Sequence, residues 1–379
     1  MVEGHSTRMA KRGSRSKVRY AVVGLGHIAQ VAVLPAFAHA KRNSELTALV
    51  SGDRVKLRAV GRKYRVSGLY SYEEYDNCLR SGDVDAVYIA LPNQLHREYA
   101  VRAARAGIHV LCEKPLAVTE ADCQAMIAAA RRGRVKLMVA YRLHFEEASL
   151  KAVEMARGRK LGEPRIFGSL FTMQVRPGNI RLEAEGGGGL YDIGIYCING
   201  ARALFAAEPT EVFAWSASNG DRRFREVDEM TAAILRFPGE RLASFTCSLG
   251  AADVSEYQVV GTKGSLRVEP AYEYAEGLVH RLQTGEQPKT KKFTKRDQFA
   301  AELLYFSDCV LRGSEPEPSG EEGLADVRVI RALLRSARTG RPARLRPFVR
   351  RRRPRLAQEI ERPPVRKPRV VRAKPPSPQ

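Results

Sequence analysis

The stretch Val-Arg-Tyr-Ala-Val-Val-Gly-Leu-Gly-His-Ile-Ala, residues 18–29, decides the fold of this chain. Its first half is a short apolar run, as in a buried strand, and an apolar helix is expected from the motif to about residue 40. Gly24, Gly26 and Ala29 fit G-x-G-x-x-A, in which the glycines allow a tight turn and close approach of a pyrophosphate. The helix N-terminus then favours the phosphate charge. Because strand and helix flank the motif as it requires, the sequence predicts dinucleotide binding rather than an ordinary glycine-rich turn.

The same alternation of strand and helix continues to about residue 143. Thr119 is a plausible N-cap for the last of these helices. Such alternation indicates βαβ units, so residues 18–143 are predicted to form a Rossmann-type, doubly wound parallel sheet. Further strands are expected at 46–50, 84–91, 109–112 and 136–140, and helices at 55–64, 97–106 and 119–132.

Residues 144–346 have a different rhythm, with closely spaced strand candidates and turn signals such as Pro238-Gly239. They predict an α+β domain on a large, mostly antiparallel open sheet, against which Trp215 is expected to pack. The strands are expected at 165–175, 211–216, 230–237, 242–248, 256–260 and 265–268, and the helices at 146–157, 190–205, 299–311 and 324–337.

The charge of the chain is concentrated at its two ends. Of the net +22, residues 341–379 carry +12 and residues 1–17 carry +4, which leaves +6 for the body. We expect residues 1–17 to be a basic disordered N-terminus and residues 347–379 to be an Arg/Pro-rich disordered tail. The run Arg350 to Arg353 could contact a polyanion, but no aromatic residues interleave to stack on bases, so a nucleic-acid function is not expected.

Other function classes are excluded by what the sequence lacks. No apolar stretch reaches the ~20 residues that span a membrane, and residues 1–17 lack the apolar part of a secretory signal, so a cytoplasmic protein is expected. The six cysteines are scattered without C-x-x-C spacing, so we predict neither a metal site nor a redox pair.

The end of the second strand selects between NAD and NADP. NAD enzymes usually place an acid there for the ribose hydroxyls, but here Ser51 occupies the expected position, followed by Gly52. Arg54 and Lys56 are near enough to meet a 2′-phosphate, which favours NADP. Asp53 would take the role of the acid if the strand ended two residues later, and Arg54 and Lys56 could equally be a solvated helix start.

Two further motifs supply candidates for catalysis. Glu113-Lys114-Pro115 follows a predicted strand, at the edge where open α/β sheets bind ligands. Asp192 and Tyr196 are four residues apart on a predicted helix and so share a face. Tyrosine has a free pKa of about 10, and a nearby ammonium favours the phenolate that could act as a base.

Together with Pro92-Asn93-Gln94-Leu95-His96 and Gly187-Gly188-Gly189-Leu190-Tyr191-Asp192, these segments make the chain resemble the Gfo/Idh/MocA family of sugar oxidoreductases. The resemblance covers about residues 18–345 and is strongest to the aldose–fructose branch, which includes glucose–fructose oxidoreductase. That branch has tyrosine at the position of Tyr196, where many members have histidine, and it holds NADP tightly. In the family the second sheet often forms an oligomer interface, which implies a homo-oligomer, a dimer or a tetramer.

The resemblance implies that Lys114 and Tyr196 flank the substrate beside the nicotinamide, and the chemistry of the side chains suggests a role for each and for Asp192. Tyr196 is assigned as general acid/base, Lys114 as the cation that positions substrate and tunes Tyr196, and Asp192 as a hydrogen-bond acceptor for substrate. Each has a simpler interpretation: a surface lysine, a core tyrosine and a helix cap. Arg142 and His144 are candidates for lining the cleft. The predicted cofactor-binding set is Gly24, Gly26, His27, Ile28, Ala29, Ser51, Gly52, Arg54, Lys56, Leu91, Pro92, Asn93, His96, Glu113, Lys114 and Arg142.

The function predicted from the sequence is therefore NADP-dependent hydride transfer to or from a sugar, as aldose oxidation to a lactone, ketose reduction, or both. The alternative is a non-catalytic NADP-binding sensor or interaction protein, because a Rossmann fold does not fix function.

Overall fold

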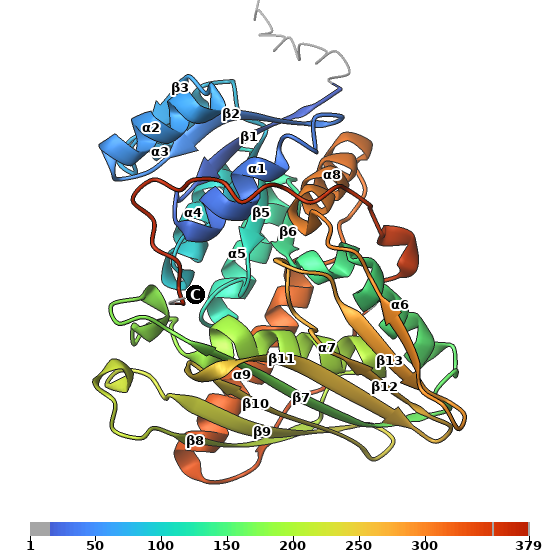
Figure 1. The fold of residues 1–379 in the computed structure, drawn as a ribbon. Helices are drawn as coiled ribbons and strands as arrows, with labels where there is room; N and C mark the ends of the chain where they lie inside the picture. The colour runs from blue at the N-terminus through green and yellow to red at the C-terminus, as the bar shows by residue number, and fades with distance from the viewer. Residues whose placement is uncertain (1–15, 351, 378–379) are drawn as a thin grey trace, which may run out of the picture.

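The computed structural model describes residues 16–350 and 352–377, and it is organised by two β-sheets (Figure 1). Residues 1–15 of the predicted disordered N-terminus lie outside the described part. The first sheet is parallel, with strand order β3-β2-β1-β4-β5-β6. The second is mixed but mostly antiparallel, with order β14-β13-β12-β11-β7-β10-β9-β8-β15. The predicted fold class is confirmed.

The first domain has the Rossmann arrangement of strands joined by helices. Its strands are β1 (Val18–Val23), β2 (Ser44–Val50), β3 (Gly68–Tyr70), β4 (Ala86–Ile89), β5 (His109–Glu113) and β6 (Leu137–Ala140). Its helices are η1 (Ala29–Val33), α1 (Leu34–Ala36), α2 (Arg54–Tyr64), α3 (Tyr75–Arg80), η2 (Asn93–Leu95), α4 (His96–Arg105), α5 (Glu120–Gly133) and η3 (Arg142–Phe145).

The second domain carries helices on one face of the mixed sheet, where α7 packs on β7 and α9 on β8. Its helices are α6 (Glu147–Arg157), η4 (Ile180–Leu182), η5 (Leu190–Gly194), α7 (Ile195–Phe205), η6 (Arg222–Phe224), α8 (Gln298–Arg312) and α9 (Gly320–Thr339). Its strands are β7 (Pro164–Gln174), β8 (Glu211–Ala217), β9 (Met230–Phe237), β10 (Arg241–Ser248), β11 (Gly250–Gly261), β12 (Ser265–Val268), β13 (Val279–Gln283), β14 (Lys289–Lys292) and β15 (Ala343–Arg344).

Local sequence explains where the elements next to the cleft begin. Gly24 has φ +94°, and a Cβ there would lie 2.4 Å from the carbonyl oxygen of Ala90, so only glycine fits the turn after β1. The predicted N-cap Thr119 is confirmed, because its side chain accepts a hydrogen bond from the amide of Asp122. The turn at Gly24 therefore ends β1 and the cap at Thr119 begins α5, both at the carboxyl edge of the parallel sheet.

One helix assigned by sequence to the second domain packs on the first. In α8, Ser307 lies 2.7 Å from the hydroxyl of Tyr20, and the helix shares an apolar core with β1. The helix predicted from the glycine motif to residue 40 is also shorter, since η1 has π-type winding and α1 ends at Ala36. Sequence periodicity could not show which sheet α8 covers, because both domains offer an apolar face.

The other face of the second sheet is apolar and open. Trp215, expected to pack on the sheet, has 68% of its surface exposed. Ile166, Leu242 and Ile234, on the consecutive strands β7, β10 and β9, are each about half exposed. Aliphatic and aromatic side chains therefore gather on this face without cover in the single chain.

The tail differs most from its sequence-based expectation. Residues 352–377 have little regular structure beyond η7 (Leu356–Gln358), yet they follow a defined path (Figure 1, red) along the first domain. Ile360, Val370 and Val371 pack against the core shared by β1 and α8. Composition alone indicated disorder because it could not show that the second domain offers buried carboxylates to the tail's arginines.

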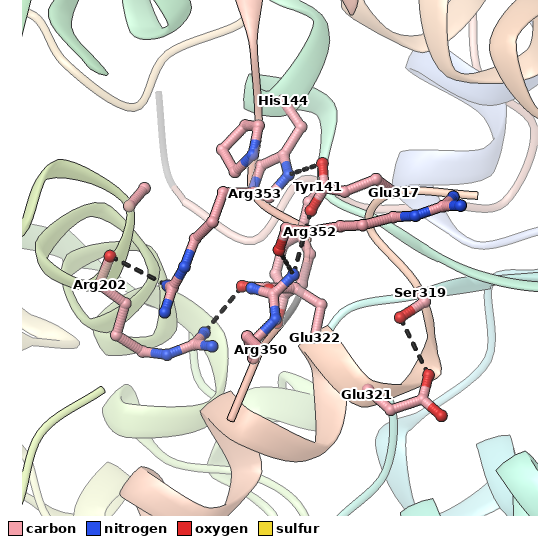
Figure 2. A network of polar contacts seen from close by, with 12 residues as sticks. Tyr141, His144, Arg202, Glu317, Ser319, Glu321, Glu322, Arg350, Arg352 and Arg353 are labelled. Carbon is pink, nitrogen blue, oxygen red and sulfur yellow. Dashed lines mark hydrogen bonds and ion pairs between the residues drawn. The ribbon is translucent and has the colours of Figure 1, made fainter. Parts of the chain in front are cut away.

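Those carboxylates form the network in Figure 2. Arg350 contacts Glu322 and lies 3.2 Å from Glu317, and all three side chains are almost fully buried. Arg353 pairs with Glu208 at 2.9 Å. Burial would raise the pKa of Glu317, but His144 and Arg350 lower it to about 2. A buried carboxylate requires such partners, so the arginines hold the tail to the second domain.

Within the described ranges, no helix is long and apolar enough to cross a membrane.

Candidate active site

A cleft of about 940 Å³ lies at the carboxyl edge of the parallel sheet and is closed on its other side by the second domain. This is where open α/β sheets bind their ligands. Of the predicted site residues, the cleft is lined by Gly26, His27, Ile28, Lys56, Leu91, Pro92, Asn93, Glu113, Lys114, Arg142, Asp192 and Tyr196.

The glycine turn suits a dinucleotide pyrophosphate. An added Cβ at Gly26 would meet no atom within 4 Å, so the backbone there is open to the cleft. Gly24 and Ala29 do not line the cleft, since Gly24 forms the turn and Ala29 is fully buried behind it. Gly24 thus makes the tight turn, Gly26 leaves room for the pyrophosphate, and Ala29 packs behind the turn, as the motif requires. Beside them, burial lowers the pKa of His27, and Arg181 lowers it further.

The end of β2 shows whether Ser51 or Asp53 directly follows the second strand, a point that the sequence left open. The strand ends at Val50, so Ser51 directly follows it, and its side chain is buried. Asp53 instead caps α2, where it accepts a hydrogen bond of 3.0 Å from the amide of Lys56. Gly52 packs against the ring of Tyr72. Arg54, like Ser51 and Gly52, does not line the cleft, whereas Lys56 does.

The prediction that His96 lines the cofactor site is wrong. Its ring is fully buried, and its two nitrogens lie 2.9 Å from the carbonyl oxygens of Pro115 and Leu91. Burial lowers the pKa of His96. The ring therefore ties together the loops after β4 and β5, and it acts on the cleft only by placing Leu91 and the Lys114-Pro115 turn.

Lys114 and Asp192 meet at the centre of the cleft. The Lys114 ammonium donates to the carbonyl oxygen of Asp192 at 2.6 Å and lies 3.4 Å from its Oδ1. Arg181 donates to Oδ2 of the same carboxylate. Burial would raise the pKa of Asp192, but Arg181 and Lys114 lower it to about 2. The carboxylate is thus ionised above about pH 3. The stability that it contributes is lost as the pH falls below about 3 toward its lowered pKa.

Tyr196 lies beside this pair, at the start of α7. The Lys114 ammonium is 4.8 Å and the Arg142 guanidinium 5.1 Å from the centre of its ring. Phe171 packs edge-on against the same ring at 5.7 Å. Two cations therefore lie over one tyrosine ring, an attractive arrangement for its π face. Arg142 is itself buried and fixed by the side chain of Gln298.

Asp192 and Tyr196 reach the same cleft although the helix between them is irregular. Asp192 lies in η5, which has π-type winding, and Tyr196 lies in the α-helix that continues from it. Such π segments are frequent at functional sites. The sequence spacing predicted a shared face, and both residues do line the cleft.

Two parts of the site were missed by sequence reasoning. Arg181 lies in the three-residue helix η4, which is too short to give a periodic pattern, so nothing marked it as a partner of Asp192. The tail residues Ala373, Lys374 and Pro376 line the cleft although they follow the second domain in sequence. His144, a candidate for the cleft, instead joins Glu317 and Asn199 in the buried network (Figure 2). Among residues 16–350 and 352–377, no cluster of His, Cys, Asp and Glu could hold a metal ion.

Comparison with known proteins places this site in a family. Residues 18–141 match the oxidoreductase family model with an NAD-binding Rossmann fold, GFO_IDH_MocA, and residues 149–267 match the GFO/IDH/MocA C-terminal domain. A D-xylose 1-dehydrogenase [NADP(+)] of Haloarcula marismortui is 34% identical, over 86% of this chain and 93% of that protein.

Solved structures agree with the sequence comparison. The aldose-aldose oxidoreductase of Caulobacter crescentus, complexed with glycerol, has a TM-score of 0.83 and 40% identity, over 87% of this chain and all of the other. A 3-ketoreductase of Actinomadura kijaniata, in complex with NADP and TDP-benzene, has a TM-score of 0.78 and 29% identity, over 84% of this chain and 98% of the other. With both domain models matched in order, the chain belongs to the Gfo/Idh/MocA family of oxidoreductases.

Proposed function

We propose that this chain transfers hydride between NADP and a sugar, oxidising an aldose to its lactone, reducing a ketose, or both. The observation that carries the proposal is the convergence of Lys114, Asp192 and Tyr196 beside the open glycine turn. The relatives named above support both the cofactor and the substrate class.

The residues that would hold the cofactor are those of the first domain that line the cleft. Gly26 and His27 would face the pyrophosphate, and Lys56 would meet the 2′-phosphate. Leu91 and Pro92 lie farther along the same edge, toward Lys114. When bound, the nicotinamide accepts or supplies the hydride. The buried Ser51 supports NADP, since it and not an acid directly follows β2.

The remaining chemistry belongs to the chain. In alcohol oxidation the Tyr196 oxygen takes the proton of the sugar hydroxyl, and in carbonyl reduction it returns that proton. Lys114 and Arg142 stabilise the negative charge that the tyrosine holds after losing its own proton. Asp192, kept ionised by its two cations, accepts a hydrogen bond from a second sugar hydroxyl and orients the ring. Lys114 is engaged with Asp192 and acts through charge, not as a nucleophile.

The proposal is tested on purified protein. Nucleotide released by denaturation is identified by chromatography, and the nucleotide-free protein is then mixed with NADP⁺ and aldoses, or NADPH and ketoses, while nicotinamide absorbance is followed. We expect NADP(H) to bind and at least one sugar to turn over. Binding of NADP(H) without turnover of any aldose or ketose would favour the non-catalytic alternative, and absence of binding would refute both.

We also propose that the chain forms a homo-oligomer through the open face of the second sheet, where Ile166, Trp215, Ile234 and Leu242 are exposed. Light scattering after gel filtration should give a multiple of the monomer mass. Replacing Ile234 by Lys should then yield monomers, because a buried unpaired charge is costly at such an interface. If the unaltered protein and the Ile234→Lys variant have the same mass, this face is not the oligomer interface.

A further inference from the structure

The last described residues of the tail, 369–377, form a segment that we call the C-terminal strap. It crosses over the first domain near α1 and then turns toward the second domain (Figure 1). The Lys63 ammonium donates to the carbonyl oxygen of Arg369 at 2.8 Å. The amide of Val371 donates to Oε1 of Gln30 at 2.7 Å, and Nε2 of Gln30 donates back to the Val371 carbonyl at 2.9 Å.

This paired contact places the strap next to the dinucleotide motif. Gln30 lies in η1, immediately after the glycine turn, and only 2% of its surface is exposed. Its side-chain amide also donates to the carbonyl oxygen of Leu25, within the motif. A buried amide that satisfies both its donor and acceptor groups holds its partner in a defined register. The strap is thus fixed where the cofactor is expected to bind.

The next residue of the strap reaches the N-terminus of α2. Nε of Arg372 lies 3.2 Å from Oδ2 of Asp53, the residue that caps α2. The amide of Lys56 lowers the pKa of Asp53, and the charge of Arg372 lowers it further. Asp53 is therefore a carboxylate near neutral pH, and its charge is offset by a residue more than 300 positions away in sequence.

The strap then enters the cleft and ends on the second domain. Ala373, Lys374 and Pro376 line the same cleft as Gly26 and Lys56. The backbone amide of Arg176, just after β7, donates to the carbonyl oxygen of Pro376 at 2.8 Å. The strap therefore spans the cleft from one domain to the other and adds the cation of Lys374 to it.

We propose that Arg372 is a specificity-determining residue of the cofactor site. An acid near the end of the second strand selects the ribose hydroxyl of NAD and repels the 2′-phosphate of NADP. By pairing with Asp53, Arg372 removes that selection, and Lys374 adds positive charge to the cleft that Lys56 also lines. The strap thereby makes this site accept NADP although Asp53 is present. The inference rests on the proposed function, because it concerns the same cofactor site.

The test measures dissociation constants of NADP⁺ and NAD⁺ by titration calorimetry on nucleotide-free, full-length protein. In Arg372→Gln, we expect NADP⁺ to bind about tenfold or more weakly, as for loss of a charge-assisted contact. NAD⁺ should bind at least as well as before, because Oδ2 of Asp53 is then free to accept from the ribose while Oδ1 still caps α2. Adding Asp53→Asn, which keeps a side chain able to cap α2, should restore NADP⁺ binding in the double variant.

Arg366→Gln is the matched control, since it removes the same charge from the tail outside the strap. It should leave both constants unchanged. The inference is overturned if Arg372→Gln leaves the ratio of the two constants unchanged, weakens both cofactors equally, or tightens NADP⁺, or if Asp53→Asn gives no rescue. These outcomes differ from failure of the proposed function itself, in which the unaltered protein binds neither nucleotide or binds NADP(H) without turning over any sugar.

Discussion

Replacing Tyr196 by Phe is expected to lower kcat by about 10² to 10⁴-fold, the range lost when a general acid/base is removed. The change deletes one oxygen and leaves the ring that packs between Phe171 and the two cations. KM and cofactor affinity should therefore change little. Steady-state kinetics on the sugar found by screening, together with titration of NADP⁺, measure these quantities separately.

Tyr99→Phe is the control for this prediction. Tyr99 is a buried tyrosine of α4, its ring lies against Arg102, and it does not line the cleft. Its loss of a hydroxyl should leave kcat unchanged. If Tyr196→Phe retains full turnover, another group must move the proton and the assignment is wrong.

Replacing Lys114 by Met should reduce kcat/KM by about 10² to 10³-fold, comparable with removal of one group that stabilises developing charge. The variant keeps an unbranched side chain, one atom shorter, but removes the charge beside Tyr196 and one of the two cations on Asp192. Arg181 still pairs with Asp192, so the protein should fold. Steady-state kinetics measure kcat/KM of the variant, and thermal denaturation checks that it is folded.

Lys136→Met is the matched variant, because the Lys136 side chain is about as buried as that of Lys114 but pairs with Glu315 away from the cleft. It should keep its activity. A Lys114→Met enzyme within a few-fold of the unaltered protein would show that Lys114 only supports the local structure.

The features that the sequence predicted correctly depend on interactions between residues that are close in sequence. The Rossmann half was predictable because its signals are local: an apolar strand, a turn that only Gly24 fits, and a capping Thr119. Lys114 and Tyr196 were found for the same reason, since each lies within a local motif. The short strand β3 and the strands β13 and β14, at one end of the second sheet, were missed because few side chains in them are buried.

The parts that could not be predicted depend on contacts between distant segments. Arg181 contributes to the site only because η4 lies against η5, where Arg181 donates to Asp192. His96 was assigned to the cofactor because its neighbours are, yet its ring points into the interior, between Leu91 and Pro115. The tail gave a pattern typical of disorder, since ion pairs with Glu317 and Glu322 leave no periodic signal in the sequence.

The two ends of the tail should respond differently to ionic strength. The pair of Arg350 and Glu317 is shielded from solvent, with 4% and 6% of the side chains exposed, so dissolved ions screen it little. The pair of Arg372 and Asp53 is 60% and 28% exposed and lies within reach of screening ions. Added salt should therefore weaken the contact of Arg372 with Asp53, while the pair of Arg350 and Glu317 keeps the start of the tail bound. The preference for NADP should then decline at a lower salt concentration than the one that unfolds the protein.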